Sequence, residues 1–223
     1  MKFSCALILA LAFAPSLAFG ADPAATPAPD GHPTATEQPF ISKISSDLQA
    51  RFATTDAAVK AGYIRFTDED STGAISYANR QWTSADPAHP SQLWYDVNGR
   101  LIGADFSVLQ ANSPNAPSLW GVQASRWQKI PAHVHFGVAG PNGTTVYGGA
   151  GPKSMAAING DMAAPTPATV VALGKAKSAD DVRFVFAFPA IWDLIVWVVP
   201  NPSGAFAEKN PNVIPSKNAK MQM

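Results

Sequence analysis

The dipeptide Asn98-Gly99, which lies between two runs of alternating apolar and polar residues, constrains the fold more than any other stretch of the sequence. Asn-Gly in this setting is the strongest short-range signal for a β-hairpin with a type I′ turn, and it predicts strands over residues 92–97 and 100–108. Successive side chains of a strand point to opposite faces, so Trp94 and Asp105 fall on the polar face of this hairpin. The expected pairs are Val97 with Arg100, Tyr95 with Ile102, Trp94 with Gly103, Leu93 with Ala104, and Gln92 with Asp105.

Other segments extend this pattern into a mainly β chain with a helical beginning. Apolar residues recur at helical spacing over residues 41–52, which is typical of one buried helix face. Thr54-Thr55-Asp56 is expected to cap a second short helix that ends near Gly62. Thr166-Pro167 is expected to open another helix that continues to residue 173. The other predicted strands cover residues 63–67, 74–79, 130–138, 144–148, 183–188 and 191–199.

The composition agrees with this fold class. The 20 prolines and 16 glycines suit many short strands joined by turns. We therefore expect a mainly β (α+β) chain, with an antiparallel β-sandwich or barrel of about seven to nine strands. A short helical segment should precede the strands.

The first residues predict export. Lys2 precedes an apolar run, and small residues follow it up to Ala21, as in a secretory signal peptide over residues 1–21. The apolar run is shorter than the roughly 20 residues that cross a bilayer. The only cysteine, Cys5, lies in this segment, so the mature chain has no disulfide. We expect a periplasmic or secreted protein that is not inserted in a membrane after signal cleavage.

Composition also divides the rest of the chain. Residues 22–39 are rich in Pro, Ala and Thr and are predicted to be a disordered linker. Residues 40–215 are predicted to be a single β-rich domain, and residues 216–223 a flexible tail. The full chain has 16 basic and 16 acidic residues, so loss of Lys2 leaves one net negative charge and no basic stripe. This excludes nucleic acid as an expected partner, while the oligomeric state stays open.

The stretch with the clearest chemical potential is the His-x-His of the strand at 130–138. His133 and His135 share one face, about 6.6 Å apart along the strand, while the residues between them face the core. Imidazole is the commonest metal ligand in proteins, so this pair predicts a site for a divalent metal or iron. Asp105 is the candidate third ligand, and Tyr147 is another if its strand pairs with the histidine strand. Two alternatives stay open: a metal-free pocket whose imidazoles bind a small molecule, and a sheet face that meets water.

A long aromatic loop over residues 112–127 accompanies this strand. Loops of this length often form a lid or a binding loop, so Trp120 and Trp127 are candidate ligand-binding residues. Trp94, on the polar face of the hairpin, is a third. Trp120 and Trp127 are equally suited to closing one end of the core.

Several stretches resemble a group of uncharacterised exported bacterial proteins. The matching residues are 57–63, 93–95, 101–106 and 199–206. The resemblance implies export but carries no activity. Members of that group have histidines in the strands equivalent to residues 74–77 and 193–197, where this chain has Ser76 and Ile195. If those histidines act in the group, His133 and His135 would have to replace them here.

A more local resemblance concerns residues 131–136 with Gly140-Pro141, which look like the ferric-iron strand of intradiol ring-cleavage dioxygenases. Those β-sandwich enzymes open catechols with an iron held by two His and two Tyr. The resemblance implies that His133 and His135 are the histidine ligands. Ile130 replaces the arginine usual in that family, and no upstream Tyr lies in a matching motif.

Three functions follow from these observations. The first is an exported protein that binds a small ligand or a metal ion at the His-x-His strand. The second is a metal-dependent oxygenase of the intradiol type acting on an aromatic substrate. The third is a structural envelope protein without a site. The sequence contains no nucleophile elbow and no phosphate-binding or dinucleotide-binding loop, so whether the chain is an enzyme stays open.

Overall fold

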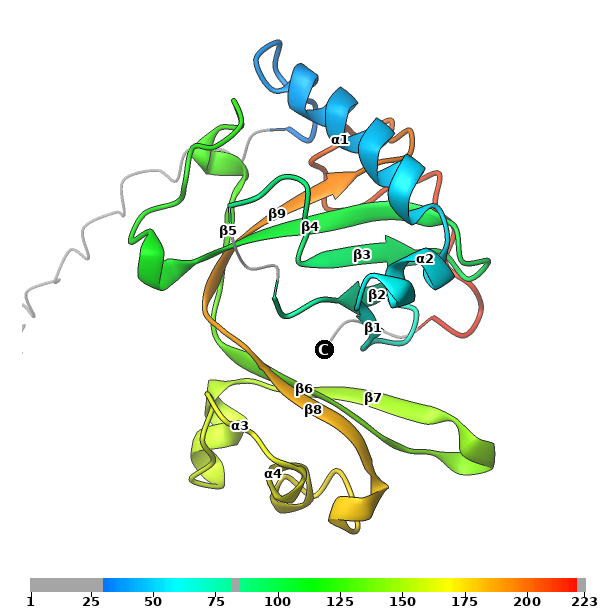
Figure 1. Ribbon diagram of the computed structural model, residues 1–223, viewed down its shortest axis with the longest axis vertical. Coiled ribbons are helices and arrows are strands. Elements are labelled where there is room, and N and C mark those ends of the chain that lie inside the picture. Colours follow the sequence, from blue (N-terminus) through cyan, green and yellow to red (C-terminus); the bar gives the residue numbers. More distant parts are fainter. Residues whose placement is uncertain (1–29, 82–84, 220–223) are drawn as a thin grey trace, which may run out of the picture.

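The computed structural model describes residues 30–81 and 85–219, which form two antiparallel sheets with short helices (Figure 1). The prediction of a mainly β, antiparallel fold is confirmed. Neither strand order closes on itself within the described residues, which favours the two-sheet alternative over a barrel. The first sheet has the order β1 (Ile64–Arg65), β2 (Ile75–Ala78), β3 (Gln92–Tyr95), β4 (Leu101–Leu109), β9 (Ile191–Trp197) and β5 (Gln128–Ile130). The second has the order β7 (Thr145–Ala150), β6 (His133–Ala139) and β8 (Val182–Phe188).

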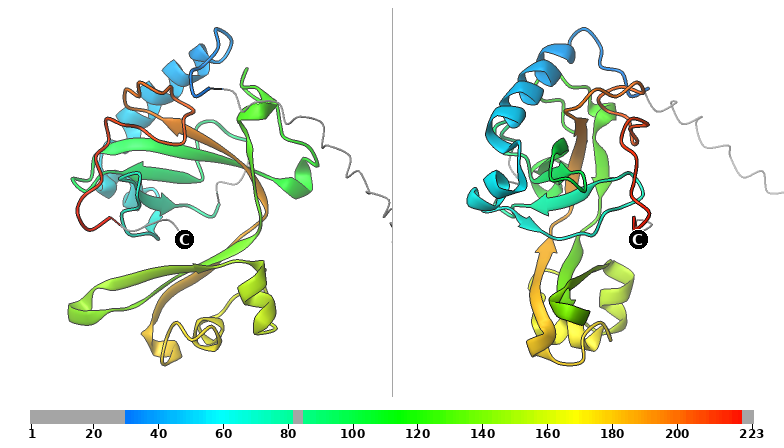
Figure 2. Two further views of the ribbon diagram at one scale, coloured as in Figure 1. Left: turned by 180° about the vertical axis from the view of Figure 1, so that it is seen from behind. Right: turned by 90° about the vertical axis from the view of Figure 1, so that its right-hand side faces the viewer.

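Two neighbouring chain segments cross from one sheet to the other (Figures 1 and 2). β5 pairs with β9 in the first sheet, and their continuations β6 and β8 pair in the second. Pro131 separates β5 from β6, and Pro189 separates β8 from β9. Proline has no amide hydrogen for the ladder, so the pairing is interrupted at both places and each segment can change direction.

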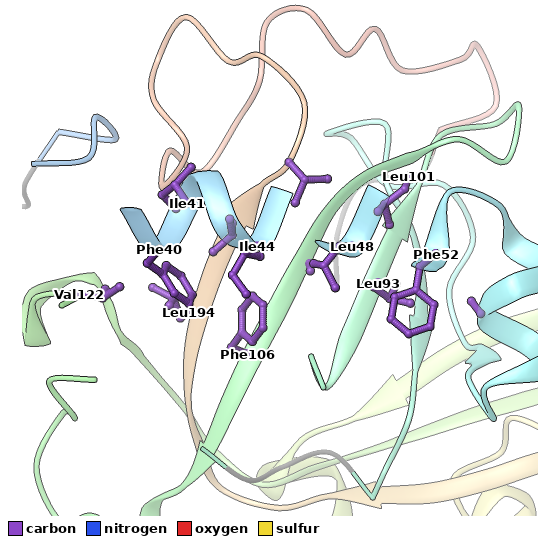
Figure 3. Close-up of a cluster of buried hydrophobic side chains, with 14 of the residues drawn as sticks. Phe40, Ile41, Ile44, Leu48, Phe52, Leu93, Leu101, Phe106, Val122 and Leu194 are labelled. Carbon is purple, nitrogen blue, oxygen red and sulfur yellow. The ribbon is translucent and has the colours of Figure 1, made fainter. Parts of the chain in front are cut away.

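Helix α1 (Gln38–Phe52) covers one face of the first sheet, followed by α2 (Thr55–Lys60). Figure 3 shows its apolar side chains pointing at Leu93, Leu101, Phe106 and Leu194 of the sheet. The predicted helix face is therefore confirmed. Thr54 caps α2 as predicted, since its hydroxyl accepts the Ala57 amide. The residues of α1 buried in this contact are Phe40, Ile41, Ile44, Leu48 and Phe52.

The β3–β4 hairpin has the predicted register at one end only. Gln92 lies opposite Asp105 as predicted, and the next two pairs also agree with the prediction. A bulge after Trp94 then sets Tyr95 opposite Leu101, so the predicted pairing of Tyr95 with Ile102 is wrong.

The turn of this hairpin is also longer than the predicted type I′ turn. Gly99 has a positive φ of 74°, but Asn98 is not among the described residues with positive φ, and a type I′ turn needs both. The Asp96 carboxylate instead accepts the amides of Asn98 and Arg100. This side chain stabilises a longer turn, in which Val97 and Arg100 are not paired.

The second sheet is covered on its outer face by α3 (Pro152–Ala157) and α4 (Pro167–Ala172). Val134, Phe136 and Val138 pack against these helices, as their alternation with the histidines predicts. Helix α3 was not predicted. It has only six residues and buries only Met155, so it shows no apolar residues at helical spacing. Short 3₁₀ turns complete the chain at η1 (Gln110–Asn112), η2 (Ala124–Arg126), η3 (Pro141–Gly143) and η4 (Ala179–Asp181).

The residues just before α1 are packed, which corrects the predicted linker over residues 22–39. α1 already begins at Gln38, and the side chain of Glu37 is fully buried. Arg126 contacts both Glu37 carboxylate oxygens, at 3.2 and 3.1 Å, and also donates to the carbonyls of Asp30 and His32. Phe206 lies under the Arg126 guanidinium, at 4.8 Å. A buried ion pair therefore holds residues 30–37 against the long loop and the C-terminal segment.

The C-terminal segment lies along the first sheet as well (Figure 2). Ser216 donates its amide to Glu69 at 2.7 Å, so the predicted flexible tail is attached at its first residue. The predicted signal peptide and residues 22–29 and 220–223 lie outside the described residues. No helix in the described part of the chain is both long and apolar enough to cross a membrane.

Leu48 tests the contact between α1 and the sheet. Its side chain is completely buried, so Leu48→Ala removes apolar contacts and leaves a cavity. We expect the free energy of unfolding in urea to fall by about 2–5 kcal/mol. Lys43→Ala, on the exposed face of the same helix, is the control and should change stability by less than about 0.5 kcal/mol. Equal effects of the two substitutions would contradict the packing described above.

Arg126 tests the anchoring of residues 30–37. Arg126→Met leaves the Glu37 carboxylate buried without its cation, and we expect a loss of about 3–5 kcal/mol in the free energy of unfolding. The double variant Glu37→Gln/Arg126→Met removes both charges and should recover part of that loss. Arg183→Met, at an exposed position, is the matched control. A double variant no more stable than Arg126→Met would show that the buried charge is not the cause.

Candidate functional site

His133 and His135 lie on the inner face of the second sheet, and their ring centroids are 4.8 Å apart. β8 sets Phe188 opposite His133 and Phe186 opposite His135, so these phenylalanines share the histidine face. Phe66, which follows β1 of the first sheet, packs against the rings of His135 and Phe186. The histidines therefore face an aromatic cluster between the two sheets, in which both are half-buried.

His135 is the inner member of the pair. Phe66 meets its ring edge-on at a centroid distance of 4.5 Å, and Phe186 lies at 5.6 Å. Gly149 lies beside it, and a Cβ at that position would be in ordinary contact with His135 Nδ1, at 3.7 Å. Burial, and secondarily the nearby His133, lowers the pKa of His135 to about 3. The imidazole is therefore neutral near pH 7, and none of the described residues forms a hydrogen bond with it.

His133 is held in a defined orientation. Its ring stacks on Phe188 at a centroid distance of 5.5 Å and an interplanar angle of 4°. His133 Nδ1 lies 2.8 Å from the carbonyl oxygen of Pro131. A carbonyl can only accept, so Nδ1 carries the hydrogen and the lone pair of the neutral ring is on Nε2. Nε2 is thus the atom with which His133 can accept a hydrogen bond or bind a metal.

A hollow of about 470 Å³ lies next to this pair, at the corner where the chain crosses between the sheets. Its walls are mostly apolar, and Arg80 supplies the one charged side chain of the lining. The guanidinium carbon of Arg80 is 5.6 Å from the Phe186 ring centroid. Neither Arg80 nor the hollow was predicted, because Arg80 lies in no periodic segment. The lining residues are Arg80, Ala132, Met162, Ala163, Ala187, Phe188, Pro189 and Ala190.

The structure does not bring Asp105 to the histidines, so the predicted three-residue metal site is wrong. Asp105 lies on β4 in the first sheet, where its carboxylate accepts the indole hydrogen of Trp94 at 3.1 Å. No group of three or more His, Cys, Asp or Glu side chains among the described residues can hold a metal ion. Two imidazoles within an aromatic cluster are an incomplete ligand set for iron or another divalent metal.

The tyrosines do not complete an iron site of the intradiol type either. Tyr63 donates its hydroxyl to the carbonyl of Pro90, and Tyr95 donates to that of Phe52. Tyr77 stacks edge-on against Tyr95, in the cluster under α1. Of the four tyrosines, only Tyr147 lies on a strand beside the histidine strand, and its ring is covered by Arg65. The two tyrosine ligands implied by that resemblance are therefore not assembled around the histidines.

The three predicted ligand-binding tryptophans all pack within the first sheet and its covering segments. The ring of Trp120 stacks on Phe40 of α1 at a centroid distance of 5.2 Å and packs against Trp127 at a centroid distance of 5.7 Å. Both tryptophans therefore close the end of the core. Trp94 packs against Trp197 at 5.3 Å. The packing therefore favours the alternative in which Trp120 and Trp127 close one end of the core and do not bind a ligand.

A pair of buried carboxyl groups lies on the face of the first sheet that is opposite to α1. Asp105 and Asp193 come from the neighbouring strands β4 and β9, and are only 5% and 8% exposed. Ser107 donates to Asp193 Oδ1 at 3.0 Å, whereas Asp105 Oδ1 has no hydrogen-bond partner among the described residues. Asp193 was not singled out from the sequence, where it only interrupts an apolar run.

Burial favours the protonated form of both carboxyl groups. Burial raises the pKa of Asp105, and the neighbouring Asp193 raises it further. Burial likewise raises the pKa of Asp193 to about 7, against the opposing hydrogen bond from Ser107. The pair is thus uncharged at low pH and ionises at a cost as the pH rises.

Comparisons with family models, curated proteins and solved structures found no match to the chain. The function is therefore inferred from the side chains of the two sheets and the hollow between them.

The buried acid pair makes stability depend on pH. Because the folded-state pKa of Asp193 is raised above the value of about 4 in an unfolded chain, the folded state holds a proton that the unfolded state releases. We expect the free energy of unfolding to decrease as the pH rises from about 4 to 7. Asp193→Asn should flatten this dependence. The measurement is urea unfolding at several pH values.

Asp180→Asn, at an exposed position, is the control for the acid pair and should leave the pH profile unchanged. A wild-type protein whose stability rises over the same pH range would show that these carboxyl groups are not the dominant titrating groups.

Proposed function

We propose that this chain is an exported protein that binds a small organic ligand in the hollow beside His133 and Phe188. The observation that carries the proposal is the hollow itself. Its volume of about 470 Å³ falls within the range of about 300–1,000 Å³ that is usual for small-ligand sites. Such sites combine mostly apolar walls with a few polar groups that fix the orientation of the ligand, and this corner has both.

The two imidazoles of β6, the strand that follows Ala132 of the lining, supply hydrogen-bonding groups near the hollow, although neither lines it. In the neutral ring of His133 the lone pair is on Nε2, because the Nδ1 hydrogen is bonded to the carbonyl of Pro131. His135 is neutral over the physiological range, because burial lowers its pKa to about 3. An uncharged imidazole can donate from one nitrogen and accept at the other, at little cost of desolvation compared with a charged group.

Export is proposed on the predicted signal peptide of residues 1–21. The remainder of the chain has no cysteine, so an oxidising compartment would not alter its covalent structure. A periplasmic or secreted binding protein is consistent with both features. The ligand would then be a small molecule taken from the medium or the cell envelope.

Filling the hollow tests this function. Ala132 lines it, so Ala132→Phe should block ligand access, while Ala156→Phe on the exposed face of α3 is the size-matched control. Ligand-observed NMR on the mature chain, with a panel of small aromatic and branched aliphatic acids, amides, alcohols and amines, should give saturation-transfer signals. We expect Ala132→Phe to lower the affinity by more than about tenfold, or 1.4 kcal/mol, and the control to retain it.

Three outcomes would overturn the proposal. The first is that binding survives in Ala132→Phe. The second is that no member of the panel binds, as expected of a structural protein without a site. The third is stoichiometric metal in the protein purified from the periplasm that is lost in His133→Ala/His135→Ala, which would indicate a metal site instead.

A further inference from the structure

We infer that the ligand of the hollow is a small monocarboxylate with an apolar body, and that Arg80 binds its carboxylate group. This inference rests on the proposed function and specifies its ligand class. Arg80 is the one charged residue in the lining of the hollow, which contains no acidic side chain. The site therefore presents a single positive charge to whatever occupies it.

Among the described residues, Arg80 differs from the other arginines in having no polar partner. Among the described residues it forms no hydrogen bond or ion pair, and its contact is with the ring of Phe186 at 5.6 Å. The sequence has five other arginines, and each of them is bonded to an acid or to oxygen atoms. Arg51, Arg65, Arg100 and Arg126 pair with Asp47, Asp68, Asp96 and Glu37, and Arg183 donates to Thr145 Oγ1 and the Gly143 carbonyl.

A guanidinium group with free donors beside a hollow is suited to an anion. Its planar N–H groups match the two oxygens of a carboxylate in a bidentate geometry. The Phe186 ring holds the cation at the wall without using its donors. His135 adds no charge, because burial keeps its imidazole neutral near pH 7.

The charge balance favours a monoanion over a phosphate ester. One guanidinium can neutralise one negative charge, whereas a phosphate dianion would bring a second charge into apolar walls at a large desolvation cost. The apolar part of the ligand would lie against Phe188, Ala132 and Met162. The chemical class is thus an aromatic or branched aliphatic acid.

Matched acid and amide pairs separate this inference from the proposed function. Phenylacetate, 4-methylpentanoate and benzoate would each be titrated by calorimetry against the mature chain, beside the corresponding primary amides and phenyl phosphate. We expect at least one acid to bind at least tenfold more tightly than its amide, and more tightly than phenyl phosphate. Raising the salt concentration should reduce this preference, as for any contact between ions.

Variants of Arg80 test whether its guanidinium group causes the tighter binding of the acid than of the amide. Arg80→Gln should abolish the difference between the acid and its amide, and Arg80→Lys should retain part of it, because lysine keeps the charge but loses the bidentate geometry. Arg183→Gln is the control, since it removes an exposed arginine of the second sheet that is outside the hollow. Arg80 is itself exposed, so these variants should fold, which thermal melting followed by circular dichroism would verify.

The possible results are distinguishable. If acids and amides bind equally and Ala132→Phe blocks both, the carboxylate inference is wrong while the binding site stands. If phenyl phosphate binds best, the ligand class is a phosphate ester and the inference is again wrong. If none of the acids binds, the inference fails, and the neutral and cationic members of the wider panel decide whether the proposed function fails with it.

Discussion

The crossing of two chain segments between the sheets is the constraint on which the site depends. β5 and β9 pair in the first sheet, and the same segments continue as β6 and β8 in the second. Pro131 and Pro189 interrupt the ladder at the corner, because neither can donate a backbone hydrogen bond. His133 is the first residue of β6 after Pro131, and Phe188 is the last residue of β8 before Pro189. The two residues pair directly. The hollow lies beside them, with Phe188, Ala132, Pro189 and Ala190 in its lining.

Burial determines the charge of the polar groups near this corner and on the first sheet. It lowers the pKa of His135 and raises that of Asp105 and Asp193, so each of these groups tends toward its neutral form. Glu37 behaves differently. Burial also opposes its ionisation, but hydrogen bonds from Arg126 and from the amides of Thr34 and Gln123 outweigh burial, and its pKa is lowered. A buried charge is retained where a cation contacts it directly, and the arginine at the hollow lacks such a counter-charge.

Periodicity predicted the elements well where one face of a strand or helix is uniformly apolar. The buried face of α1 and the core positions Val134 and Phe136 follow directly from spacing, since burial of alternate or helically spaced residues needs no knowledge of the partner. The errors lie where a single side chain overrides the pattern. The Asp96 carboxylate changed the hairpin turn, and Arg126 ordered a stretch with the composition of a linker. The Asp96 contact is local, whereas the Arg126 contact joins residues 89 positions apart and is not visible in the local sequence.

The sequence by itself determined the mainly β class, the helical beginning and the fact that His133 and His135 share the face opposite to the core residues of their strand. Only the tertiary structure decided what that face meets. It placed Asp105 in the other sheet, set Phe66 and Phe188 around the imidazoles and brought Arg80 to the hollow. The physical reason is that an alternating pattern specifies which side of a strand is buried, whereas its neighbours depend on strand order and on where the chain crosses between sheets.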